Sequence, residues 1–163
     1  MVSMNSDTTG LRPAALKALI VTEAIFAFLG FASGFLLLLS PSGKAMGLSL
    51  DLLENTPVGD FALVGLFFIA FYGLLPSLAV YGLLTKKRLR LTESLDRWTG
   101  QHWAWTASVA EGLIMLLWIG VELVLLGFLS GVGGVLQVII TCLGLLILGL
   151  AARPSVRSSM KVP

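Results

Sequence analysis

Three glutamates lie within long apolar runs of this chain, where carboxylates are the side chains with the greatest chemical capacity. Glu23 falls in the run 14–39, and Glu111 and Glu122 fall in the run 103–128. An ionisable side chain inside a membrane-spanning helix is costly unless it faces protein, water or a partner. We therefore expect all three carboxylates to point inward, where such groups bind a cation, carry a proton or hold a lipophilic amine.

Helical spacing brings two of these carboxylates onto one face. At positions i, i+4, i+7 and i+11, the run 103–128 carries a stripe of Glu111, Met115, Trp118 and Glu122. Glu111 and Glu122 then point in directions within about 20° of each other and are separated by roughly 16 Å along the helix axis. We expect Glu111 and Glu23 at similar depths in the inner half, and Glu122 near the outer surface.

The other runs carry matching stripes of small and polar residues. Glu23 shares its face with Gly30 and Gly34, a G-x-x-x-G motif that permits close helix contact. In the run 61–84, Pro76 lacks an N–H and leaves the carbonyl of Tyr72 in need of another donor. With Gln137 and Thr141 from the last run, the candidate ligand-binding residues are Glu23, Tyr72, Glu111, Trp118, Glu122, Gln137 and Thr141.

Two interpretations of the carboxylates stay open. In the structural one, Glu23 is protonated and hydrogen-bonds across the bundle to Glu111, Gln137, Thr141 or Tyr72, while Glu122 reaches the surface or pairs with Lys44. In the functional one, the carboxylates line a cavity and bind a ligand or an ion.

Other reactive side chains are few. His102 is the single histidine, and its position beside Trp103 is typical of catalytic and of interfacial histidines alike. Cys142 is the single cysteine, which excludes a disulfide within the chain and favours a small buried apolar role. The sequence shows no paired-histidine haem site, no nucleotide motif and no metal cluster. We therefore assign no catalytic residue, metal or cofactor.

The composition identifies the elements that position these residues. Of 163 residues, 56% are hydrophobic and 12% are charged, and the mean hydropathy of +0.94 excludes an ordinary water-soluble domain. We predict an all-α, polytopic membrane protein of one domain, residues 1–163, whose four-transmembrane-helix bundle has spans at about 14–39, 61–84, 103–128 and 133–152.

Cation placement predicts the orientation. Apart from Lys44, every lysine and arginine lies at the two ends of the chain or in the loop between the second and third spans. The positive-inside rule then puts both termini and the loop between the second and third spans in the cytoplasm. The extracytoplasmic loop 40–60 is long, and we expect a short helix there that caps the bundle. We expect Trp98, Trp103 and Trp105 to anchor the membrane interface.

The segments PSGKAMGLS, LLENTPVGDF, HWAW and RPSVR carry a resemblance. Together they resemble small bacterial four-helix inner-membrane proteins, loosely those of the DoxX-like group, which implies the fold and supplies no site residues. The arrangement of four helices is also similar to that of small multidrug-resistance transporters, which have a glutamate in the first helix. Glu23 matches that glutamate here. The arrangement is similar as well to that of the emopamil-binding and sigma-2 receptor group, with its carboxylate-bearing sterol cavity.

Three function classes follow. We expect an accessory or assembly subunit of a membrane complex, with membrane lipids and other subunits or a second copy as partners. The alternative is a transporter or binder of small lipophilic or cationic molecules, and the next is a membrane enzyme acting on a lipid-soluble substrate. An enzyme is the weakest of the three, since no nucleophile is evident, and nucleic acid is not an expected partner.

Overall fold

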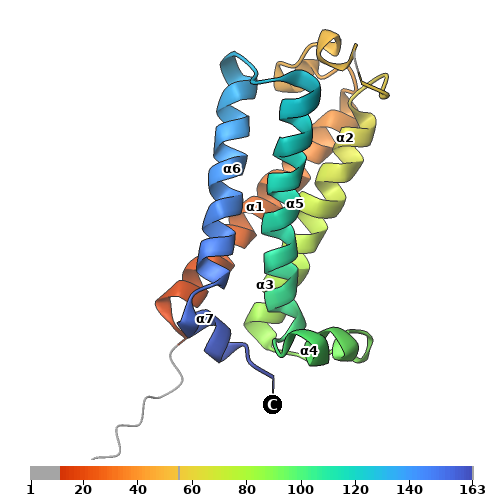
Figure 1. Ribbon diagram of the computed structural model, residues 1–163. Helices are drawn as coiled ribbons and strands as arrows, with labels where there is room; N and C mark the ends of the chain where they lie inside the picture. Colours follow the sequence, from red (N-terminus) through yellow and green to blue (C-terminus); the bar gives the residue numbers. More distant parts are fainter. Residues whose placement is uncertain (1–11, 55, 163) are drawn as a thin grey trace, which may run out of the picture.

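The computed structural model describes residues 12–54 and 56–162 and shows a bundle of helices (Figure 1). In this part of the chain, four helical segments are long and apolar enough to span a membrane: α1 (Ala14–Leu39), the continuous segment Ala62–Thr85, α5 (Trp103–Leu126) and α6 (Gly131–Ala151). The predicted all-α class and the four membrane-length helices are thereby confirmed.

The predicted limits agree closely with these helices. The first span is unchanged, and the second lies one residue later at each end. The third ends at Leu126 rather than near 128, because Gly127 adopts a left-handed φ of 71° that ends the helix. The fourth is α6, which begins at Gly131 rather than 133 and ends at Ala151.

The four helices form a ring in chain order. Helix α1 packs against the second helical segment and α6, and α5 packs against α3 and α6. Two short 3₁₀ helices, η1 (Lys44–Met46) and η2 (Leu50–Leu53), lie at one end, which we call the loop end. The opposite end carries α4 (Glu93–Thr99) and α7 (Pro154–Ser159), and we call it the basic end (Figure 1).

The second segment changes its helical geometry around Pro76. It consists of α2 (Ala62–Phe67), a π-helical stretch η3 (Phe68–Leu74) and α3 (Leu75–Thr85), and the Leu75 N–H donates to the carbonyl of Ala70. Pro76 has no N–H and cannot donate the usual helical hydrogen bond to the Tyr72 carbonyl. A local widening to π-helical geometry is a known accommodation of such a missing bond. The Ser77 hydroxyl donates to the Gly73 carbonyl at 2.7 Å and satisfies one more acceptor.

Glycines let α1 lie directly on the second segment, as the G-x-x-x-G motif predicts. A Cβ added at Gly30 would lie 2.2 Å from the carbonyl carbon and oxygen of Tyr72. The carbonyl predicted to be affected by Pro76 therefore faces the Gly30 backbone. One turn further, a Cβ at Gly34 would lie 2.8 Å from the carbonyl oxygen of Gly65.

Two expectations for single side chains are corrected. Trp103 is 6% exposed, and its Nε1 donates to the Lys87 carbonyl at 2.9 Å. Trp105 is half-buried and donates to the Ala151 carbonyl, and Trp98 is 84% exposed, so the interfacial role of these two stays a prediction. Cys142 is exposed on α6 rather than buried, because it lies opposite the stripe that packs.

The loop end is capped by apolar side chains of a loop that forms two 3₁₀ helices, where the sequence predicted one short helix. Leu37, Leu53 and Phe61 form a small core with neighbouring loop residues that include Met46 and Leu48. The Phe61 N–H donates to the Pro41 carbonyl at 2.9 Å and joins the two ends of the loop. The long connection thus folds back over the bundle, as its length predicts.

Gly30→Ala should destabilise the protein by about 1–3 kcal/mol, because the new methyl group overlaps the Tyr72 backbone. The measurement is thermal unfolding of the purified protein in detergent. Gly149→Ala is the matched control, since a Cβ there meets nothing within 4 Å, and helix propensity then favours alanine. Equal midpoints for the two variants would refute the close approach.

Candidate functional site

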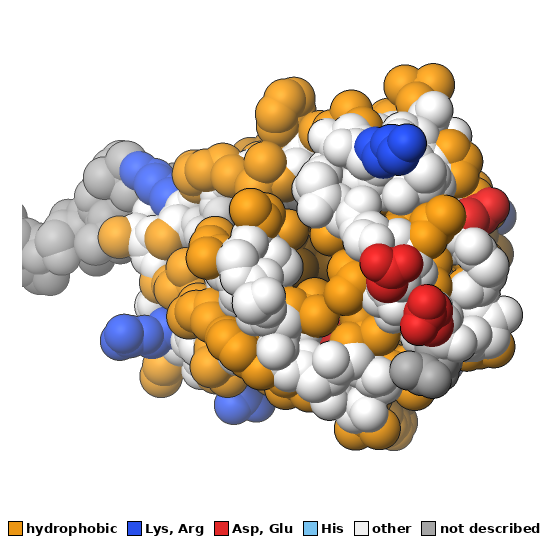
Figure 2. All heavy atoms as spheres, turned by 90° about the horizontal axis from the view of Figure 1, so that it is seen from above, with side chains coloured by type: hydrophobic (Ala, Val, Ile, Leu, Met, Phe, Trp, Pro, Cys, Tyr) orange, Lys and Arg blue, Asp and Glu red, His pale blue; other side chains and the backbone are white. Residues whose placement is uncertain are grey.

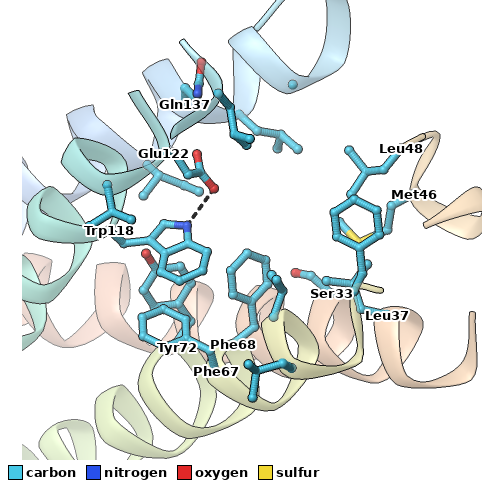
Figure 3. Close-up of a pocket in the computed structure, with 18 of the residues that line it drawn as sticks. Ser33, Leu37, Met46, Leu48, Phe67, Phe68, Tyr72, Trp118, Glu122 and Gln137 are labelled. Atoms are coloured by element: carbon cyan, nitrogen blue, oxygen red, sulfur yellow. Dashed lines mark hydrogen bonds between the residues drawn. The ribbon is translucent and has the colours of Figure 1, made fainter. Parts of the chain in front are cut away.

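A cavity of about 760 Å³ lies between the helices in the half of the bundle nearer the loop end (Figure 3). Its origin is a divergence of helices: α5 packs extensively on α3 but meets η3 at few positions. The second segment and α5 therefore separate toward the loop end. Figure 2 shows this end of the molecule, with hydrophobic side chains around a hollow near its middle.

Aromatic rings form the floor of the cavity. Phe67 stacks on Trp118, with ring centroids 4.2 Å apart and an interplanar angle of 21°. Phe68 stacks on Tyr72, with centroids 5.0 Å apart. Apolar side chains of α1, α6 and the capping loop, such as Leu37, complete the wall (Figure 3). The cavity is therefore suited to a lipophilic molecule.

Glu122 supplies the acidic group on this apolar wall. Its Oε1 accepts a hydrogen bond from Trp118 Nε1 at 2.7 Å, drawn as a dashed line in Figure 3. The expected pairing of Glu122 with Lys44 is wrong: Lys44 is exposed in η1, and Trp118 is the partner. An indole one turn before a glutamate on the same face is a nearer donor than a loop lysine.

Gln137 also lines the cavity, but its amide is occupied by the turn between α5 and α6. Its Oε1 accepts from the Leu129 N–H at 3.0 Å, and its Nε2 donates to the Gly127 carbonyl at 3.3 Å. Thr141 donates to the Gln137 carbonyl of its own helix at 2.7 Å and does not line the cavity. Neither residue is the predicted partner of Glu23.

Glu23 and Glu111 lie together below the cavity, on the side of the basic end. Both side chains are 0% exposed, and their carboxyl groups are close enough to interact electrostatically. Within the described residues, no carboxyl oxygen of either side chain has a hydrogen-bond partner. The Ser108 hydroxyl lies near Glu23 but donates to the Ala104 carbonyl at 3.0 Å.

The burial and the hydrogen bonds of Glu23 bear on two expectations, its inward position near Glu111 and its hydrogen bond across the bundle. The inward direction of both side chains is confirmed, since Glu23 and Glu111 are 0% exposed, whereas their common depth stays a prediction. The predicted hydrogen bond to Glu111, Gln137, Thr141 or Tyr72 is wrong, because these carboxyl oxygens are unpaired within the part of the chain that is described. An unpaired buried polar group costs about 1–3 kcal/mol, and such groups concentrate at functional sites.

Tyr72 connects the two levels. Its side chain is 2% exposed and lines the cavity, and its hydroxyl has no partner among the described residues. Tyr72 is within electrostatic range of the Glu122 carboxyl at the cavity and of the buried Glu111 carboxyl, which is itself within range of Glu23.

His102 has a structural role that its sequence position did not reveal. It is the N-cap of α5, and its Nδ1 accepts from the Ala104 N–H at 3.2 Å. It lies at the basic end, outside the lining of the large cavity. In the described segments, no group of three or more His, Cys, Asp or Glu side chains is placed to hold a metal ion.

Sequence reasoning did not single out the aromatic floor formed by Phe67 and Phe68. It did expect the loop that carries Met46 and Leu48 to cap the bundle, but not that these side chains line a cavity. The loop 40–60 alternates apolar and charged residues, and it has more apolar residues than a solvent-exposed connection needs. This pattern was a usable signal that the loop contributes to an apolar site.

Glu111→Met should raise the free energy of unfolding by about 1–3 kcal/mol, because it replaces an unpaired buried carboxyl with an apolar side chain of similar length. Glu122→Met should lower it by about 1 kcal/mol, because the Trp118 N–H loses its acceptor. Thermal unfolding in detergent compares the two variants. A loss of stability in Glu111→Met would mean that this carboxyl has a stabilising partner.

Comparison of the chain with family models, with curated proteins and with solved structures found no match. The resemblance to the DoxX-like group stays a prediction. The function must therefore be argued from the cavity and its side chains.

Proposed function

We propose that the protein binds a small lipophilic molecule in the cavity at the loop end, with Glu122 as its polar contact. The supporting observation is the cavity itself: its volume of about 760 Å³ falls within the roughly 300–1,000 Å³ typical of ligand sites. Such sites combine an apolar lining with a few polar groups that orient the ligand. Glu122 and Tyr72 have that position here.

A lipophilic amine is the ligand class that these side chains favour. Trp118 occupies one carboxyl oxygen of Glu122, and the carboxyl has a second oxygen for a ligand donor. The aromatic faces of the floor attract a cation. Three exposed acidic residues, Asp51, Glu54 and Asp60, belong to the loop end, where Figure 2 shows acidic side chains beside the hollow. Together they attract cations and repel anions.

The wall between α2 and α5 gives such a molecule a route from the lipid. Leu63 and Leu66 on α2 and Leu125 on α5 line the cavity and are also exposed, with Leu125 at 45%. Side chains that face both the cavity and the outside mark an opening in the helix ring. A lipophilic amine dissolved in the acyl chains therefore enters between α2 and α5.

The basic end faces the cytoplasm of a bacterial inner membrane in this proposal, and the loop end faces outward. The support is the cation distribution, with Lys44 alone at the loop end and the other lysines and arginines at the basic end. The sequence on its own favours an accessory subunit of a membrane complex whose polar stripes serve packing, with other subunits or a second copy as partners. The cavity favours ligand binding instead, and membrane lipids remain the surrounding partners.

The test is titration of the purified protein with a fluorescent hydrophobic amine, followed by quenching of tryptophan emission. Ile140→Trp fills the cavity from α6 and should weaken binding at least about tenfold, which corresponds to roughly 1.4 kcal/mol. Leu145→Trp is the matched control, because Leu145 is 56% exposed on the same helix and is not among the lining residues.

Glu122→Gln tests the ligand's contact with the carboxyl group separately from its contacts with the apolar cavity wall. It should weaken binding of the amine about tenfold and leave an uncharged analogue of the same shape within about twofold. Equal binding by Ile140→Trp and Leu145→Trp would contradict the cavity proposal. In that case a protein partner that co-purifies in fixed ratio would favour the accessory role.

A further inference from the structure

A second, smaller hollow lies at the basic end and is lined by cations. It is a crevice of about 170 Å³, and its lining includes Lys86, Arg88, Lys161 and His102. No acidic side chain is among its lining residues. It is separate from the large cavity, with which it shares no lining residue.

Three segments distant in sequence build this crevice. Lys86 ends α3 in a left-handed conformation with φ of 52°, and its Nζ donates to the Ser159 carbonyl at 3.0 Å. The backbone N–H of His102 donates to the Met160 carbonyl at 2.7 Å. These bonds hold the C-terminal segment against the start of α5, and they place Lys161 beside the cations of the loop after α3.

His102 contributes an unused hydrogen-bond donor. The imidazole is 5% exposed, and its Nδ1 already accepts from the Ala104 N–H. A neutral imidazole that accepts at Nδ1 carries its proton on Nε2, so Nε2 is a donor. This Nε2 is buried and has no partner within residues 12–54 and 56–162. A buried donor without a partner is costly and calls for an explanation.

We infer that this crevice binds a phosphate group. Phosphate offers several strong acceptor oxygens and a negative charge, and lysine and arginine are its usual partners. The Nε2–H of His102 then donates to a phosphate oxygen, and the three cations balance the charge. Trp98 on α4, exposed at the same end of the bundle, belongs at headgroup level in a membrane. The phosphate comes from an anionic phospholipid headgroup or from free phosphate.

Native mass spectrometry of the full chain in a nonionic detergent tests the inference, with phosphatidylglycerol and phosphatidylcholine as probes. Arg88→Gln with Lys161→Gln should weaken phosphatidylglycerol binding at least about tenfold. The control pair Arg90→Gln with Arg97→Gln removes the same charge from exposed positions outside the crevice. It should keep binding within about twofold, and phosphatidylcholine should bind more weakly throughout.

His102→Asn isolates the imidazole, because asparagine can still cap α5 but lacks Nε2. It should also weaken phosphatidylglycerol binding several-fold while thermal unfolding shows that the protein is folded. Competition by millimolar inorganic phosphate would identify a site that takes free phosphate. Failure to compete would identify the lipid headgroup as the source.

Two results would overturn the phosphate site. One is equal loss of phosphatidylglycerol binding in the crevice pair and the control pair, which would mean that general surface charge is responsible. The other is a His102→Asn protein that binds phosphatidylglycerol as tightly as the unchanged protein does.

Discussion

The structure depends on the absence of water within a hydrocarbon layer, which leaves a carboxyl group no favourable place except the interior of the bundle. Glu23 and Glu111 obey this constraint completely, since both are fully buried and lie within electrostatic range of each other. Their positions determine which faces of α1 and α5 turn inward. The inward positions of the α1 glycines and of the α5 stripe that ends at Glu122 follow from that rotation.

Close packing on one side of the bundle and separation on the other produce the cavity. The Gly30 backbone touches Tyr72 and holds α1 against η3, whereas α5 departs from the second segment above α3. The π-helical stretch before Pro76 lies at this point of departure and carries Phe68 and Tyr72 into the floor. Tyr72 lines this cavity and lies within electrostatic range of both Glu122 and the buried Glu111.

The helices and their inward faces could be predicted from the sequence because length, hydropathy and 3.6-residue spacing are local properties. The partners of the polar groups could not. Glu122 is bonded to Trp118 rather than Lys44, and Gln137 is used by the α5–α6 turn rather than Glu23. Which hydrogen-bond partner each side chain has depends on helix divergence and turn geometry, and both arise from packing between segments. For the same reason the position and the aromatic lining of the cavity could not be predicted, although a cavity was one interpretation of the carboxylates. Four of its lining residues, Tyr72, Trp118, Glu122 and Gln137, were among the predicted site residues.

The pairing of Glu23 with Glu111 is the central claim, and solid-state NMR tests it in a bilayer without any substitution. With glutamate labelled at the side-chain carboxyl carbon, the account predicts a through-space correlation between the carboxyl carbons of Glu23 and Glu111. It also predicts that neither carbon correlates with lipid acyl-chain protons, since both side chains are fully buried. Absence of the Glu23–Glu111 correlation, or strong contact of either carbon with the acyl chains, would contradict the account.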